Sequence, residues 1–224
     1  MDSSYHETQY NIFTEYEAKY GKTTFGPMSS FTWNNDPKRL LFMLARYKSV
    51  ASLLRGSKHA LEIGCGDSFA SRIVCQSVSN LTVTDIDSEL LEQAKLASKK
   101  PYEYETLYHD FSVAPLTSID DFDCAYLLDV LEHIQFQNQD NFLSNIKSSL
   151  LPYSKVLIGM PSLESQIYAS KESAAGHVNC QTKLGLQESL SRIFPSVTLF
   201  SMNDEVLHTG FDQMSHYLLA LCIT

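Results

Sequence analysis

The sequence predicts an α/β protein in which helices cover both faces of a mainly parallel sheet. Three observations support this class. From about residue 57, short apolar runs alternate with segments of helical periodicity, which is typical of β-α-β units. The last two apolar runs are joined by about a dozen residues without helical periodicity, too few for the crossover that a parallel pair needs. A hydrophobic share of 44% is sufficient for a core.

The central part of the chain supplies five strands and three helices of this fold. The strands are expected at 58–65, 80–87, 104–110, 122–130 and 154–161. The helices between them are expected at 68–78, 88–100 and 139–151. Ser88 is a suitable N-cap for the second helix, and lysines in its last turn complement the helix dipole. Pro161 ends the fifth strand.

The C-terminal part breaks the parallel pattern. A helix is expected at 183–194, followed by strands at 195–204 and 215–224. Because the loop between these strands is short, we expect them to form an antiparallel hairpin. The whole sheet would then have seven strands, the last of them reversed.

The N-terminal part does not show the alternation and predicts a helical appendage. A helix at 11–21 would end at Gly21, and the stretch 22–36 is interpreted as a loop. An amphipathic helix would follow at 37–56, with Pro37 in its first turn, where the missing N–H has no cost.

Charge and segment composition narrow the functional classes. The chain of 224 residues has a net charge of −9 and an isoelectric point of about 5.2, which argues against a general nucleic-acid partner. The N-terminus lacks the basic start and apolar stretch of a signal peptide, and no apolar run is long enough to span a membrane. We therefore expect a soluble cytoplasmic protein without a membrane partner, and the sequence leaves a homodimer open.

A glycine motif after the first expected strand indicates a nucleoside cofactor. Gly64 and Gly66 lie in the stretch ALEIGCGDSFAS (60–71), between an expected strand and an expected helix. Asp85 ends the second strand about 20 residues later, where an acidic side chain accepts hydrogen bonds from a ribose diol. The pattern is typical of a nicotinamide or flavin dinucleotide and also of S-adenosylmethionine (SAM).

The residues around the glycines favour SAM. A dinucleotide fingerprint, G-x-G-x-x-G, needs a small residue at the position of Phe69. Glu62 and Asp67 would repel a pyrophosphate, whereas they suit the cationic amino and sulfonium groups of SAM. An NAD-dependent oxidoreductase remains a more distant alternative.

Four segments, in this order and spacing, resemble the class I SAM-dependent methyltransferases. They are ALEIGCGDS, LTVTDIDSELLEQA, YHDF and FDCAYLLDVLEHI. The resemblance covers about residues 58–162 and is closest to the branch of the ubiquinone-pathway O-methyltransferases and other small-molecule methyltransferases. It implies a Rossmann-like sheet with a reversed last strand, and one departure is Ser68, where family members often have a third glycine.

The resemblance implies how SAM would be held. Glu62 to Gly66 would form the loop beneath the methionine moiety, with Glu62 at the amino group, although Glu62 could instead face solvent at the strand end. Asp85 would take the ribose hydroxyls, unless it caps the next helix and Asp87 shares or takes over this role. The cofactor-binding residues are expected to be Glu62, Gly64, Cys65, Gly66, Asp67, Asp85, Ile86, Asp110, Phe111 and Leu128.

The adenine contacts follow from the same resemblance. Ile86 would pack on the adenine, Asp110 would accept from its amino group, and Phe111 would support the ring. Leu128, at the end of the fourth strand, would lie beside the methionine part. Asp110 could alternatively be an ordinary turn residue.

Two histidines are candidates for the base that removes a proton from a methyl acceptor. His177 lies in a loop after the fifth strand, and His133 is expected to open the helix after the fourth strand. The Glu-His pair could instead serve local packing. Asp129, Glu132 and His133 are spaced i, i+3, i+4 and would share one face of a helix start, so that His177 could complete a divalent metal site. A similar arrangement occurs in small-RNA 3′-end methyltransferases, but the sequence alone does not favour a metal here.

The N-terminal part would then serve the acceptor. We expect residues 1–56 to be a helical cap over the acceptor site and residues 57–224 to be the SAM-binding core. Its aromatic residues could stack on an acceptor or only cover the sheet edge: Tyr16, Tyr20, Phe25, Phe31 and Trp33. For Arg46 and Arg55, pairing at the solvent-facing surface is favoured over contact with an anionic acceptor. The stretch 162–176 is a second candidate lid.

These observations favour an enzyme that methylates a hydroxyl, or an amine, of a small metabolite. Sugar nucleotides, phenols and surface-polysaccharide precursors are the expected acceptors, and S-adenosylhomocysteine (SAH) would be the product. The alternatives are an RNA-directed methyltransferase with a divalent metal at the acceptor site and a SAM-binding module without catalysis.

Overall fold

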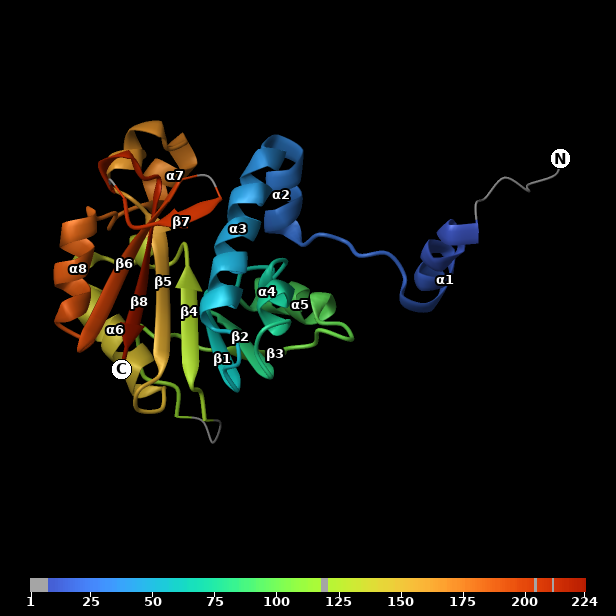
Figure 1. Cartoon of the computed structure of the whole chain (residues 1–224), viewed down its shortest axis with the longest axis horizontal. Coiled ribbons are helices and arrows are strands. Elements are labelled where there is room, and N and C mark those ends of the chain that lie inside the picture. The colour runs from blue at the N-terminus through green and yellow to red at the C-terminus, as the bar shows by residue number, and fades with distance from the viewer. Residues whose placement is uncertain (1–7, 118–120, 204, 211) are drawn as a thin grey trace.

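The computed structural model describes residues 8–117, 121–203, 205–210 and 212–224 (Figure 1). Residues 1–7 of the expected cap lie outside the described part. Strands and helices alternate from residue 59 onward, as the sequence predicts, and the last strands are antiparallel. The expected α/β class is therefore confirmed.

The described residues form one sheet of eight strands in the order β3-β2-β1-β4-β5-β8-β6-β7. The strands are β1 (His59–Ile63), β2 (Asn80–Asp85), β3 (Glu105–Tyr108), β4 (Cys124–Leu128), β5 (Lys155–Pro161), β6 (Ser196–Asn203), β7 (Val206–His208) and β8 (Tyr217–Ile223). β1 lies between β2 and β4, with all three parallel, and β8 inserts antiparallel between β5 and β6. The expected antiparallel pair is thus β6 and β8.

The number of strands differs from the expected seven. The additional strand, β7, has only three residues and pairs antiparallel with the end of β6. A segment this short carries no periodicity that a sequence pattern can reveal. It extends the edge of the sheet within the expected loop between the last two strands.

Helices cover both faces of the sheet (Figure 1). They are α1 (Asn11–Tyr20), α2 (Pro27–Asn35), α3 (Pro37–Leu53), α4 (Ser71–Cys75), α5 (Ser88–Ala97), α6 (Gln139–Ser148), α7 (Lys171–Gly176) and α8 (Lys183–Ser191). Buried residues of α3, α4 and α5 share one apolar cluster with the sheet, and those of α6 and α8 share the other. Along β4 the residues alternate between the clusters: Tyr126 belongs to the first and Leu127 to the second. This alternation follows from the two-residue period of a strand.

The N-terminal part contains three helices where the sequence predicts two. α1 and α3 lie close to their expected ranges, and Gly21 ends α1 with a φ of 71°. The expected loop 22–36 is wrong, because α2 occupies most of it. Serine, threonine and asparagine have modest helix propensity, so the local signal is weak. Figure 1 shows α1 standing away from the sheet, and none of its residues is buried.

The segments after β4 and β5 also differ from expectation. Leu131–His133 and Phe136–Asn138 form 3-10 turns, and the following helix, α6, begins only at Gln139. The stretch 162–176 contains the 3-10 turn Glu164–Tyr168 and the short helix α7. Within the described residues, no helix is both long enough and apolar enough to cross a membrane.

Candidate functional site

The glycine loop lies at the carboxyl end of β1 and has a backbone that needs glycine. Gly64 and Gly66 have φ values of 72° and 56°, in the left-handed region that side chains disfavour. A Cβ atom on Gly64 would come within 2.4 Å of Val130 Cγ2, and one on Gly66 within 2.8 Å of Met28 Sδ. Ser68 has a φ of 57°, which explains physically why a glycine would suit this position.

Glu62 is buried at the floor of this loop and does not face solvent. The hydroxyl of Tyr47 donates to Glu62 Oε1 at 2.6 Å, and that of Tyr126 donates to Oε2 at 2.7 Å. Burial raises the pKa of Glu62 above its usual range, while these hydrogen bonds oppose the shift. The two tyrosines therefore hold the carboxyl group in a fixed position at the end of β1.

Asp67 turns its carboxylate toward the N-terminal part of the chain. Its Oδ2 accepts from the backbone N–H of Ser29 at 2.7 Å, and its Oδ1 accepts from the Ser29 hydroxyl at 2.9 Å. Ser29 is in the first turn of α2, whose N-cap, Gly26, has no side chain. A Cβ on Gly26 would lie 2.4 Å from Asp67 Cβ. Asp67 thus supplies the missing capping group of α2 from 38 residues away.

Asp85, at the end of β2, binds the glycine loop directly. Its Oδ2 accepts from Gly66 N at 2.8 Å, and its Oδ1 accepts from Asp87 N at 2.9 Å. The N-cap of α5 is Asp87, which accepts from Glu89 N and Leu90 N, so the expected cap Ser88 is wrong by one residue. Asp85 does not cap this helix.

The other five expected cofactor residues have different environments. Cys65 is buried in the loop, and Ile86 follows β2 with 63% of its surface exposed. Asp110 accepts from Ser112 N at 2.8 Å within a turn. Phe111 is buried in the core, where its ring packs against His109. Leu128, the last residue of β4, contacts the backbone of Gly159, where a Cβ would lie 2.6 Å from Leu128 Cδ2.

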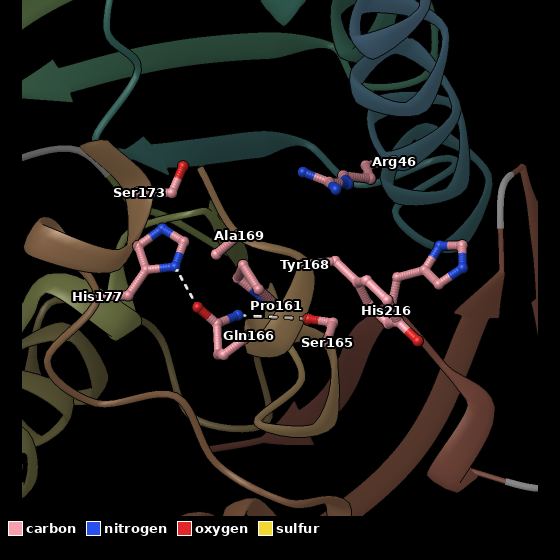
Figure 2. Close-up of a pocket in the computed structure, with 9 residues that line it drawn as sticks. All are labelled: Arg46, Pro161, Ser165, Gln166, Tyr168, Ala169, Ser173, His177 and His216. Carbon is pink, nitrogen blue, oxygen red and sulfur yellow. Dashed lines mark hydrogen bonds between the residues drawn. The ribbon is translucent and has the colours of Figure 1, made fainter. Parts of the chain in front are cut away.

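A cavity of about 350 Å³ lies beyond the carboxyl end of β5 (Figure 2). It is lined by Arg46, Pro161, Ser165, Gln166, Tyr168, Ala169, Ser173, His177 and His216. Figure 2 shows Arg46 and His177 on opposite sides of it. The cavity thus lies between the N-terminal helix α3 and the segments that follow β5.

His177, at the C-terminal end of α7, has a defined tautomer. Its Nδ1 lies 2.8 Å from Gln166 Oε1, and Gln166 Nε2 donates to the carbonyl of Ser162. This second hydrogen bond fixes the amide orientation, so Nδ1 is the donor and Nε2 keeps its lone pair. Burial lowers the pKa of His177 below its ordinary 6.5, and the charge of His133 adds to the effect. A neutral imidazole with a free Nε2 is suited to accept a proton.

The structure brings His133 next to His177. The two ring centroids are 5.3 Å apart, and His133 Nδ1 donates to the carbonyl of Gly176 at 2.9 Å. The backbone N–H groups of Val178 and Asn179 donate to the carbonyl of Glu132 and join the two segments. His133 lies in a 3-10 turn and does not open a helix, contrary to expectation.

Asp129 and Glu132 have separate environments. Asp129 has a φ of 58°, so the expected helix start at 129–133 is wrong, and its Oδ2 accepts from Arg46 Nη1 at 2.7 Å. Glu132 is fully buried, and neither of its carboxylate oxygens has a hydrogen-bond partner among the described residues. Burial raises the pKa of Glu132 to about 9, and the charge of Asp129 contributes.

Glu132, His133 and His177 fit a divalent cation. Each offers one ligand atom, and these atoms lie within 4.8 Å of one another. A buried carboxylate without partners is a strong ligand candidate, because a cation would compensate its desolvation. Both histidines donate through Nδ1 to an oxygen, which is the usual support of a metal-binding imidazole. Asp129, the fourth residue of the expected cluster, is held by Arg46.

Several residues of the site were not expected from the sequence. Tyr47 and Tyr126 hold Glu62, Ser29 binds Asp67, and Gln166 orients His177. No local pattern marks them, because each partner is distant along the chain. The one available signal was the acidic character of the loop, since a buried carboxylate requires donors.

Part of the chain matches a known family. Residues 61–158 match the model described as "Methyltransferase domain". Among curated proteins, none matches the chain at a significant level.

Solved structures of methyltransferases are similar in fold. The methyltransferase domain of bacterial CtHen1 is 16% identical, with a TM-score of 0.68 over 81% of this chain and 98% of that chain. The N-methyltransferase NodS from Bradyrhizobium japonicum, in complex with SAH, is 17% identical, with a TM-score of 0.60 over 97% and 99%. A TehB-like SAM-dependent methyltransferase from Corynebacterium glutamicum is 18% identical, with a TM-score of 0.58 over 96% of each chain. At these identities the likeness establishes a common fold.

Proposed function

We propose that the chain transfers the methyl group of SAM to a hydroxyl of a small metabolite, because residues 61–158 match a methyltransferase domain model and the fold is similar to that of a SAM-dependent methyltransferase. The observation that carries this proposal is the cavity beside neutral His177, at the same edge of the sheet as the glycine loop. Its volume of about 350 Å³ is near the lower end for small-molecule sites. Sugar nucleotides, phenols and surface-polysaccharide precursors remain the candidate acceptors, and an amine acceptor would need less help from a base.

In the proposed reaction the chain aligns two reactants and accepts one proton. The glycine loop and Asp85 would position SAM, and the cavity would position the acceptor. An oxygen lone pair of the acceptor forms the new bond to the methyl carbon while the carbon–sulfur bond breaks. Sulfur keeps the electron pair and becomes the neutral thioether of SAH. His177 Nε2 takes the hydroxyl proton.

A methyl-transfer screen with labelled SAM tests this proposal. Hydroxyl compounds and their amine analogues are offered in pairs, and His177→Ala is compared with the wild type. We expect His177→Ala to lower turnover by about 10²-fold or more with a hydroxyl acceptor, as for loss of a general base. His59→Ala, at the opposite end of β1, is the control. Normal turnover by His177→Ala would refute the role of this residue as the base.

A metal-assisted acceptor site is a second candidate, favoured by the cluster of Glu132, His133 and His177. A bound divalent ion would polarise the acceptor hydroxyl and lower its pKa. The histidines would then serve as ligands, and the hydroxyl proton would leave to solvent. The sequence resemblance implies an RNA acceptor for such a cluster. The net charge of −9 does not favour RNA as the acceptor of this chain.

Chelation separates the two candidates. With EDTA present, the first candidate requires unchanged turnover, whereas the second requires its loss and its recovery with Mg²⁺ or Mn²⁺. Glu132→Gln tests the same point, because glutamine preserves the shape and removes the charged ligand. Under the second candidate, Mn²⁺ would raise the melting temperature of the wild type and leave that of Glu132→Gln unchanged.

A further inference from the structure

On the side of the cavity opposite His177 lies Arg46, and only part of its hydrogen-bonding capacity is used within the protein. Arg46 Nη1 donates to Asp129 at 2.7 Å, and the guanidinium carbon lies 3.8 Å from the centre of the Tyr217 ring. These two contacts fix the position of the guanidinium. A guanidinium offers five N–H donors, and among the described residues the bond to Asp129 is the one hydrogen bond that its side chain makes. Arg46 is thus paired, as the sequence favours, although only 21% of its side chain is exposed.

The composition of the cavity wall suits a negatively charged ligand. None of the nine lining residues is acidic, and the remaining polar ones are serine, glutamine, tyrosine and histidine. Arg39 precedes Arg46 by seven residues, so both lie on one face of α3. The charge of Arg39 lowers the pKa of His177 slightly, and the charge of Asp129 opposes this effect. Asp129 neutralises part of the charge of Arg46, but it is not among the residues that line the cavity.

The positions of the polar groups define two ends of the cavity. Figure 2 shows Arg46 and His216 on one side and His177 with Gln166 on the other. An acceptor would reach both ends if it carried an anionic group at one end and a hydroxyl at the other. Planar guanidinium groups bind phosphate and carboxylate oxygens in a bidentate manner.

We propose that the acceptor is a small hydroxylated anion, a monophosphate or a carboxylate, whose charged group binds Arg46 while its hydroxyl faces His177. The claim that the hydroxyl faces His177 rests on the proposed function. The claim that the charged group binds Arg46 can be tested by binding alone. A monophosphate and a carboxylate both present charged oxygens to the guanidinium, and the two pairs of ligands described below distinguish them.

Calorimetry on SAH-saturated protein, with two matched pairs of ligands, tests this inference. Ribose 5-phosphate is compared with ribose, and 3-hydroxybenzoate with phenol. In at least one pair the anion should bind about 10-fold tighter or more, as expected for a hydrogen bond to a charged group. Arg46→Gln should abolish this preference, and Arg55→Gln, at an exposed position after α3, should retain it. No preference in either pair would overturn the inference.

A double variant addresses a purely structural role of Arg46. Arg46→Gln leaves the carboxylate of Asp129 unpaired, so folding is checked by near-UV circular dichroism. Arg46→Gln/Asp129→Asn removes both charges of the pair and should fold while still lacking the anion preference. If the double variant regains the preference, Arg46 only neutralises Asp129, and the inference is wrong.

Two further outcomes keep this inference separate from the proposed function. If anions bind through Arg46 but no compound is methylated, the inference stands and the proposed function fails. If neutral hydroxyl compounds are methylated and anions bind no tighter than they do, the proposed function stands and the inference fails. A short single-stranded RNA serves as the third probe, and tight RNA binding without binding of either small anion would overturn the inference.

Discussion

Ser29→Ala is expected to release α2 from the glycine loop without unfolding the sheet. The Ser29 hydroxyl donates to Asp67 Oδ1 at 2.9 Å, and both groups are buried. The substitution removes this hydrogen bond and keeps the one from the Ser29 backbone to Oδ2. The sheet and α3 do not contact the Ser29 hydroxyl through any hydrogen bond of the described residues, so the effect should be confined to α2.

The size of the effect follows from the charge of the acceptor. A hydrogen bond to a charged group contributes about 1.5–3 kcal/mol, which corresponds to a change of about 10- to 150-fold in an equilibrium constant. The opening equilibrium of α2 should increase by this factor. Alanine also improves helix propensity slightly, which opposes the release and must be measured separately.

Hydrogen exchange of the amides in 27–35 measures the opening, and Ser30→Ala is the matched control. Ser30 is the next residue of the same helix, and its hydroxyl donates at 3.2 Å to the carbonyl of Phe25 at an exposed site. Both variants gain the same propensity, so the difference between them isolates the bond to Asp67. Equal exchange in the two variants would refute the assignment of Asp67 as the capping group of α2.

Three further outcomes are expected. Asp85→Ala should weaken SAM binding about 10-fold or more in a calorimetric titration, because it removes the carboxylate that binds Gly66 N as well as the expected ribose ligand. His177→Ala should leave the dissociation constant of SAM within about two-fold in the same titration while lowering turnover, since its role is confined to proton transfer. Between pH 4.5 and about 9 the carboxyl of Glu132 is protonated in the folded chain and ionised in the unfolded one. The free energy of unfolding should therefore fall as pH rises through this window, and urea denaturation without added metal should show less of this fall in Glu132→Gln.

Sequence patterns predict the parts of this fold that depend on local periodicity. β4 and β5 are nearly continuous apolar runs because both faces of the sheet are covered, and such runs are visible without a structure. The antiparallel pairing of β8 with β6 follows from the short loop between them, which leaves no room for a crossover. The parallel pairing of β1 with β2 brings the glycine loop and Asp85 together.

The features that sequence patterns miss depend on distant partners. α2 is stabilised at its N-terminus by Asp67, which no window of neighbouring residues contains. The turn at Asp129 needs a positive φ that its residue type only weakly suggests, so the expected helix start did not form. His133 and His177 are 44 positions apart, and the backbone of Glu132 brings their segments together. The stacking of Arg46 on Tyr217 is also invisible in the sequence, because Tyr217 lies in the last strand.

Calorimetric titration of the wild-type chain with SAM and, separately, with NAD tests the central claim most directly. The buried Glu62, the carboxylate of Asp67 and the large residue Phe69 in place of a third small one leave a loop that suits the methionine end of SAM and not a pyrophosphate. We expect saturable binding of SAM and of SAH with a stoichiometry of about one per chain, as one glycine loop at one sheet edge implies, and no binding of NAD. Binding of NAD without binding of SAM would contradict the assignment of the cofactor.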